Sequence, residues 1–159
     1  MNQPGTRRSL WLLGALLAAV VLIVHARSYL PVFCDDAFIS LRYAQRLLEG
    51  RGLTWNDGER VDGYSNLLWI LSTALLGSLR VDLVVAARFL GWIGTGAAIV
   101  AVCYRYRPSL QRGFLPAFVG SLTIALSGAI AAWTIGGLEQ PMLAGLLAWT
   151  IALLPRTEA

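Results

Sequence analysis

The sequence contains few charged residues and no lysine. Only 14% of its 159 residues are charged, whereas 57% are hydrophobic and the mean hydropathy is +0.62. A soluble domain needs a polar surface, and about a quarter of its residues are usually charged. The composition therefore excludes an ordinary soluble domain and a disordered chain, and it predicts an integral membrane protein.

The basic residues and the cysteines exclude two further classes of protein. All 13 basic residues are arginines, and they stand at the ends of apolar segments instead of forming a stripe interleaved with aromatic residues. This pattern argues against nucleic-acid binding, so no nucleic-acid partner is expected. The only cysteines are Cys34 and Cys103. Two isolated thiols make neither a disulfide framework nor a metal-binding motif.

Four apolar segments are expected to cross the membrane as helices, which makes the fold an all-α membrane module over residues 1–159. They cover residues 9–26, 84–104, 114–133 and 141–154. Cytoplasmic loops are rich in arginine, and this rule places both termini in the cytoplasm, beside Arg7, Arg8, Arg105, Arg107, Arg112 and Arg156. A cleaved signal peptide is the alternative for the first segment, because its end resembles a cleavage site. In the second segment, small residues predict close helix packing: Gly91, Gly94, Thr95, Gly96 and Ala98.

Residues 27–83 are expected to form an extracytoplasmic loop, since they contain seven of the nine acidic residues. Within this loop, residues 36–48 have helical spacing. An apolar face would contain Phe38, Leu41, Ala44 and Leu48, and a polar face Arg42, Arg46 and Glu49. Residues 67–79 would rise only about 20 Å as a helix, against a hydrocarbon core of about 30 Å. Residues 36–48 are therefore predicted as an interfacial helix beside the membrane, and residues 67–79 as a second interfacial or a re-entrant helix.

Asp35 and Asp36 are the first candidates for chemistry, at the predicted start of the surface helix. Asp is a favoured N-cap residue, and acidic side chains stabilise a helix N-terminus. A carboxylate held at the membrane surface can also act as a general base towards a hydroxyl group. Capping and catalysis both remain open, and one Asp can serve each role.

A series of short motifs runs from residue 35 to residue 69. They are Asp35-Asp36, Arg42-Tyr43, Gly50-Arg51-Gly52-Leu53, Trp55-Asn56, Gly58-Glu59 and Val61-Asp62-Gly63-Tyr64-Ser65-Asn66, before Trp69. Together they resemble the first extracytoplasmic loop of membrane glycosyltransferases with the GT-C architecture. The nearest group uses polyprenyl-phosphate sugars and includes the mycobacterial terminal arabinofuranosyltransferases. Gly137-Leu138-Glu139 before Pro141 resembles the second outer loop of that family.

The resemblance implies transfer of a sugar from a polyprenyl-phosphate donor to a hydroxyl of a glycan or lipid acceptor, at the outer face of a bacterial inner membrane. It implies Asp35 as the catalytic base and Asp36 as a ligand of a divalent ion such as Mg²⁺ or Mn²⁺. Positive charge near the departing phosphate would come from Arg42 and Arg88. The other expected donor-binding residues are Tyr64, Asn66 and Glu139.

Each of these residues also has a purely structural interpretation. Arg42 can be the solvated face of the surface helix, and Arg88 can extend to the membrane interface. Tyr64 and Asn66 can simply end the loop at the membrane, and Glu139 can begin a helix.

Enzymes of the resembled family are longer and have more crossings. The chain is therefore expected to be a fragment or truncated form, or to need a partner chain that supplies further helices. The alternative functions are a membrane interaction protein that binds lipid-linked sugar without turnover and, less favoured, a small transporter. A transporter would place ionisable groups inside its spans, whereas most acidic residues here lie in the loop.

Overall fold

In the computed structural model of the chain, all elements of secondary structure among the described residues are helices, joined by connecting segments. The described residues are 4–58, 61, 63–106 and 114–155, and of residues 4–12 and 114 only the backbone is described. The helices are α1 (Pro4–Arg27), α2 (Ala37–Leu48), α3 (Leu67–Ser78), α4 (Leu83–Tyr106), α5 (Phe114–Leu126), α6 (Gly128–Ile135) and α7 (Gln140–Leu153). No strand occurs in this described part, so the expected all-α class is confirmed.

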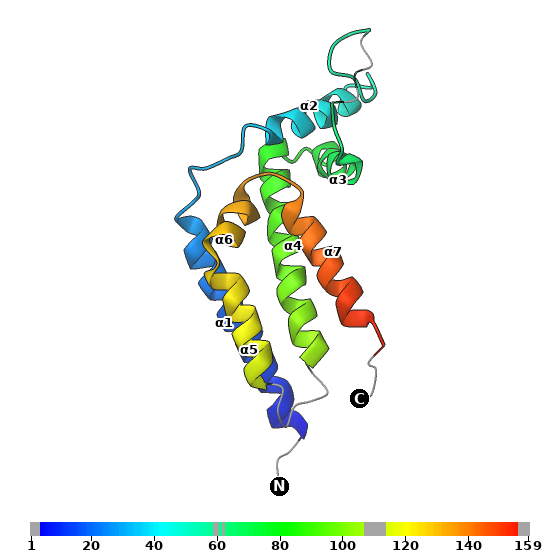
Figure 1. The fold of residues 1–159 in the computed structure, drawn as a ribbon. Helices are drawn as coiled ribbons and strands as arrows, with labels where there is room; N and C mark the ends of the chain where they lie inside the picture. The colour runs from blue at the N-terminus through cyan, green and yellow to red at the C-terminus, as the bar shows by residue number, and fades with distance from the viewer. Residues whose placement is uncertain (1–3, 59–60, 62, 107–113, 156–159) are drawn as a thin grey trace.

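The helices α1, α4, α5, α6 and α7 form an elongated body, and α2 and α3 lie together at one end of it (Figure 1). The central helix α4 packs against α7 on one side and against α5 and α6 on the other, while α1 packs along α5. The start of α1 and the end of α7 lie at the end of the body opposite α2 (Figure 1). This order of helices places α2, α3 and the α6–α7 connection towards the same end (Figure 1).

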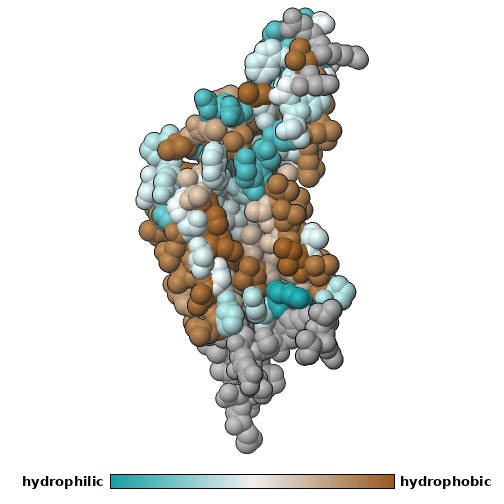
Figure 2. Space-filling view, in the orientation of Figure 1, coloured by the Kyte–Doolittle hydropathy of each residue, from teal (hydrophilic) through white to brown (hydrophobic). Residues whose placement is uncertain are grey.

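Only one helix of the described chain is long and apolar enough to cross a membrane by itself. That helix is α4, and α5 with α6 meets the same criterion only as a pair bent by 63°. Leu13–Arg27, α3 and α7 are apolar but shorter. Apolar side chains cover much of the helical body, and hydrophilic residues gather mostly towards the α2 end (Figure 2). Membrane association fits these findings, and the other expected crossings stay predictions.

The expected span over residues 114–133 is two helices instead of one. Ser127 adopts an extended conformation between them, and its hydroxyl accepts a hydrogen bond from the Ile130 N–H at 3.4 Å, which caps the start of α6. The preceding turn is supported from α1, where His25 Nδ1 lies 3.1 Å from the carbonyl oxygen of Ala125. The bend is thus stabilised by two side chains that form hydrogen bonds with backbone groups left without a helical partner at the break.

The small residues of α4 allow its backbone to approach its neighbours closely, as the sequence predicted. A Cβ added at Gly94 would collide with the backbone of Pro141, and one added at Gly91 would collide with the carbonyl group of Thr134. Gly96 is different, because a Cβ there would meet open space. Thr95 adds a buried hydroxyl contact of 2.8 Å to Thr134. The contact face therefore runs through Gly91 and Gly94, and Gly96 lies outside it.

The predicted surface helix is present as α2, but its polar face differs from the prediction. On the expected apolar face, Leu41 and Ala44 are buried, whereas Phe38 and Leu48 are 54% and 41% exposed. Arg46, expected on the solvated face, is 3% exposed. The reason is that Thr54 and Asp57 fold back against α2 and contact Arg46, and a helical wheel cannot represent such contacts.

The outer helices are joined to the body through a buried tryptophan. Trp69 of α3 is fully buried and packs in one cluster with Leu41 of α2 and Ala87 of α4. Burial of large apolar side chains is the main favourable term in such packing. Through this cluster, α4 holds both α2 and α3 in place at its first turns.

Candidate functional site

A polar pocket of about 230 Å³ lies where the start of α2, the segment before α3 and the start of α7 meet. Four residues predicted to be functional line it, namely Asp36, Tyr64, Asn66 and Glu139. Ser40 and Gln140 are among the other lining residues. Segments that are far apart in the sequence therefore meet at one site, at the end of the body where α2 lies.

Asn66 links the three parts of this pocket. Its Nδ2 atom lies 2.8 Å from Oε2 of Glu139 and 2.9 Å from Oγ of Ser40. Asn66 is also the residue before α3, but its side chain makes no capping hydrogen bond there. Because its amide is engaged with α2 and α7 instead, Asn66 sets the relative positions of the polar groups around the pocket.

Asp35 and Asp36 differ in their placement. Asp36 lines the pocket, whereas Asp35 is not among its lining residues. Asp36 stands at the N-cap position of α2, but its side chain makes no capping hydrogen bond. Oδ1 of Asp35 accepts a hydrogen bond from the Asp36 N–H at 3.0 Å and so satisfies one backbone donor at the start of the helix.

A possible metal-binding group contains the two aspartates and Cys34. One ligand atom from each residue lies within 4.8 Å of the others, and both aspartates are exposed. Carboxylate oxygens suit Mg²⁺ or Mn²⁺, whereas a thiol suits softer metals. The two carboxyl groups therefore fit the Mg²⁺ or Mn²⁺ ion implied for Asp36, and water would complete its coordination. The Cys34 sulfur does not suit such an ion.

The two predicted arginines do not line the polar pocket. Nη2 of Arg88 donates a hydrogen bond to the Leu30 carbonyl oxygen at 2.9 Å, and its guanidinium lies 5.5 Å from the centre of the Phe33 ring. Its Nε is buried and has no hydrogen-bond partner among the described residues. Arg88 thus ties the connection after α1 to the first turns of α4. Arg42 lies in α2 and is partly exposed.

Tyr43 is a residue that the sequence analysis did not assign to the site. Its hydroxyl donates to the Val61 carbonyl oxygen at 2.7 Å and accepts from the Gly63 N–H at 3.1 Å. Its ring lies edge-on to Tyr64, with 4.7 Å between the ring centres. Tyr43 therefore holds the segment that carries Tyr64 and Asn66 against α2. Its place in the Arg42-Tyr43 motif was the available signal.

Ser40 was also missed. It lies one helical turn after Asp36, and residues four apart share a face of a helix. A polar residue at this spacing from a candidate acid was therefore a usable signal. Glu59 and Asp62, which belong to the motif series, lie outside the described residues.

An ion cluster organises the loop that follows α2. Asp57 pairs with the buried Arg46, and its oxygens lie 2.7 and 2.8 Å from Nη1 of Arg51. The hydrogen bond from Arg46, followed by that from Arg51, lowers the pKa of Asp57 below its usual value. In turn, the hydrogen bond and charge of Asp57 raise the pKa of Arg51. Thr54 accepts further hydrogen bonds from Arg46 at 3.2 Å.

This cluster predicts an acid-sensitive loop. Since the pKa of Asp57 is lowered in the folded protein, its stabilising contribution is complete above the unfolded value of about 3.9 and disappears as the pH falls through the lower folded value. Asp57→Asn should reduce the hydrogen-exchange protection of residues 49–58 at pH 7 and remove this loss of protection in acid. Glu49→Gln is the control, because Glu49 lies 3.5 Å from Arg51 and does not contact Arg46. Unchanged protection in Asp57→Asn at pH 7 would contradict the prediction.

Comparison with known proteins leaves the family of the chain open. No family model, no curated protein and no solved structure matches it. The likeness to GT-C glycosyltransferases therefore rests on the motifs of residues 35–69 and 137–141. It is a hypothesis about this chain.

Proposed function

We propose that the chain is a module of a membrane glycosyltransferase that transfers a sugar from a polyprenyl-phosphate donor to an acceptor hydroxyl at the outer face of a bacterial inner membrane. The observation that carries the proposal is the polar pocket, where Asp36, Tyr64, Asn66 and Glu139 meet from three parts of the chain. Pockets that combine acidic and amide groups with an aromatic residue suit hydroxyl-rich ligands.

In the proposed reaction, the acceptor oxygen attacks the anomeric carbon and the bond from that carbon to the phosphate oxygen breaks. The proton of the acceptor hydroxyl passes to the carboxylate of Asp35, and the polyprenyl phosphate leaves with the electron pair of the broken bond. The cationic side chains of Arg42 and Arg88 are the proposed groups that stabilise the negative charge of the phosphate. Tyr64, Asn66 and Glu139 are the proposed contacts of the sugar.

A divalent ion at Asp36 is part of the proposal. Such an ion would add positive charge near the phosphate when it is bound. Asp36 borders both the polar pocket and the group with Asp35 and Cys34. Its carboxyl group is therefore placed to serve either the ion or the sugar.

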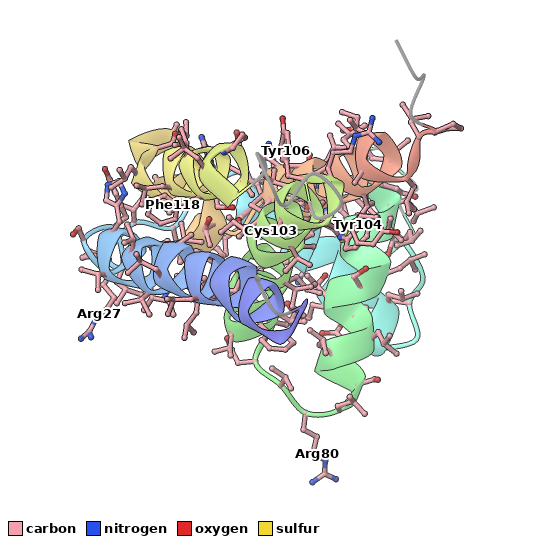
Figure 3. The ribbon with its side chains drawn as sticks, turned by 90° about the horizontal axis from the view of Figure 1, so that it is seen from below. Arg27, Arg80, Cys103, Tyr104, Tyr106 and Phe118 are labelled. Carbon is pink, nitrogen blue, oxygen red and sulfur yellow. The ribbon has the colours of Figure 1, made fainter. Side chains whose placement is uncertain are left out.

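The proposed membrane arrangement has four crossings with both termini in the cytoplasm. In it, α1, α4 and α7 cross, the bent pair α5 and α6 makes the third crossing in chain order, and α2 and α3 lie on the outer surface. The support is that α2 and α3 lie at the end opposite the start of α1 and the end of α7 (Figure 1). Arg27 and Arg80 both point away from the body (Figure 3), so a side chain at either position can reach water or lipid headgroups.

Reporter fusions test this arrangement. A fusion after Arg80 should report an extracytoplasmic position, and one after Arg112, which lies outside the described residues, should report the cytoplasm. The reason is that the 12 residues of α3 rise only about 18 Å and cannot cross the hydrocarbon core. Matching signals from the two fusions would overturn the arrangement, because α4 could then not lie across the membrane between them.

A transfer assay tests the function. Membranes that contain the chain together with any further helices of its assembly are supplied with a polyprenyl-phosphate sugar labelled in the sugar. Label should pass to an endogenous glycan or lipid acceptor, and only in membranes that contain the chain. Absence of transfer in membranes where the donor still binds the chain would favour the second candidate.

The second candidate is a membrane protein that binds lipid-linked sugar without turnover. The observation that favours it is that Asp35, Arg42 and Arg88 do not line the polar pocket. The base that acts on the acceptor and the cations that stabilise the phosphate would then lie outside the pocket that binds the sugar. Donor binding without transfer, even when the full assembly is present, is the expected behaviour of such a protein.

A further inference from the structure

A second space lies next to the polar pocket, beside Gln140 at the start of α7. It is an apolar groove of about 350 Å³ between α4, α5, α6 and α7, lined in part by Ala98, Ile130, Ala144 and Ala148. Trp133 also lines it and is 42% exposed, so the groove opens to the surface of the helical body. Its volume lies within the range of ordinary ligand sites.

The apolar lining of the groove suits a hydrocarbon chain. Such a chain is thinner than a helix, which is about 10 Å across, and it has no polar backbone groups to leave unpaired in an apolar site. The lining fits such a chain, because the alanines of α7 and α4 leave room where larger side chains would fill the space.

The groove and the polar pocket are adjacent, since Gln140 lines both. One ligand can therefore place an apolar chain in the groove and a polar head in the pocket. The pocket offers the acidic side chains of Asp36 and Glu139 with the amide of Asn66, and no arginine is among its described lining residues. Carboxyl and amide oxygens accept hydrogen bonds from hydroxyl groups, whereas a phosphate would face groups of its own charge when no divalent ion is bound at Asp36.

We infer that the groove and the polar pocket together bind one single-chain glycolipid, with its hydrocarbon chain in the groove and an uncharged, hydroxyl-rich head in the pocket. Under the proposed function, on which this role rests, the glycolipid is the acceptor. Its head then lies in the pocket beside the transferred sugar, for which Tyr64, Asn66 and Glu139 are the proposed contacts. The phosphate of the donor then lies at the border of the pocket, between Asp36 and the connection after α1 that Arg88 holds. Binding of the glycolipid itself requires no transfer.

The test uses two probes of equal chain length, a photoreactive dodecyl glucoside and a photoreactive dodecyl phosphate, with the full chain in phosphatidylcholine nanodiscs. The glucoside should label residues of α6 and α7, and the labelling should saturate as the probe concentration rises. The phosphate should label at least about tenfold more weakly at the same concentration, because like charges oppose its head in the pocket. Equal labelling by both probes would overturn the assignment of an uncharged head.

Two tryptophan variants of α7 test the groove. Ala144→Trp fills it and should lower labelling by the glucoside at least about tenfold, since the chain loses its space. Leu146→Trp is the matched control, because Leu146 is 52% exposed and does not line the groove. Equal labelling of Ala144→Trp and the parent would overturn the groove assignment. Mapping of cross-links to a second copy of the chain at α6 and α7 would instead assign the groove to an interface.

A third variant tests the head, and its outcome is independent of turnover. Glu139→Gln keeps the size of the side chain but removes an acidic group. It should therefore reduce the difference between the labelling by the glucoside probe and the labelling by the phosphate probe. An unchanged difference would contradict the placement of the head beside Glu139. Saturable glucoside binding in an assembly without transfer would refute the proposed function alone, whereas transfer without this binding would refute the inference alone.

Discussion

Asp35→Asn is expected to lower sugar transfer by about 10² to 10⁴, the usual loss when a general base is removed. The assembly tested is the one that transfers from a polyprenyl-phosphate sugar. Asn has nearly the size of Asp and still accepts the backbone hydrogen bond that Asp35 receives from Asp36. Donor binding and helical content should therefore be retained. The measurements are initial transfer rates at saturating donor, donor binding and thermal unfolding.

Asp36→Asn and Glu139→Gln are the comparison variants for this prediction, because both residues line the polar pocket. If Asp35→Asn transfers sugar at the parent rate, Asp35 is structural. The base is then the residue, Asp36 or Glu139, whose substitution abolishes transfer. A fall in unfolding free energy of about 1 kcal/mol with unchanged chemistry would indicate a capping role for Asp35. Loss of donor binding together with transfer would instead indicate a binding role.

Gly94→Ala is expected to destabilise the helical body by about 1–3 kcal/mol or more, the cost of inserting atoms into a packed interior. The new methyl group would collide with the backbone of Pro141, which cannot rotate away as a side chain can. The α4–α7 contact must then open. Because Pro141 follows Gln140, the polar pocket should be displaced with it, and the contact between Asn66 and Glu139 should weaken. Unfolding in a denaturing detergent measures the stability.

Gly96→Ala is the matched control in the same helix. A Cβ at Gly96 meets no atom within 4 Å, so the substitution adds no collision. Alanine favours a helix over glycine by up to about 1 kcal/mol, so this variant should be as stable as the parent or more stable. Equal stability of the two variants would contradict the close α4–α7 packing. Glucoside binding should be lost in Gly94→Ala and retained in Gly96→Ala.

The sequence determined the helical class and the approximate positions of the helices. Composition and apolar run length are local properties, and they located α2, α3 and α4 within a few residues. The small residues of α4 likewise predicted a contact face, because close approach of two backbones needs the absence of a side chain. Gly91 and Gly94 meet this condition, and the partners they approach were unknown until α6 and α7 were placed.

The burial of Arg46 in α2 was decided by tertiary structure. Periodicity alone assigned Arg46 to the polar, solvated face of the helix, and this assignment was wrong. The buried position of Arg46 depends on Asp57 and Thr54, which fold back over the helix from a later loop. A buried charge is tolerated only when such partners are present, and they lie outside the window that a helical pattern examines.

The membership of the polar pocket was also decided by tertiary structure. Asp36, Asn66 and Glu139 were candidates one by one, but their meeting depends on the bend at Ser127 and on the packing of α7 against α4. The same packing leaves Asp35 and Arg88 outside the pocket lining. Sequence motifs identify residue types suited to a chemistry, whereas distances between them arise from contacts between segments 26 and 73 residues apart. Those contacts are set by packing, which no local pattern encodes.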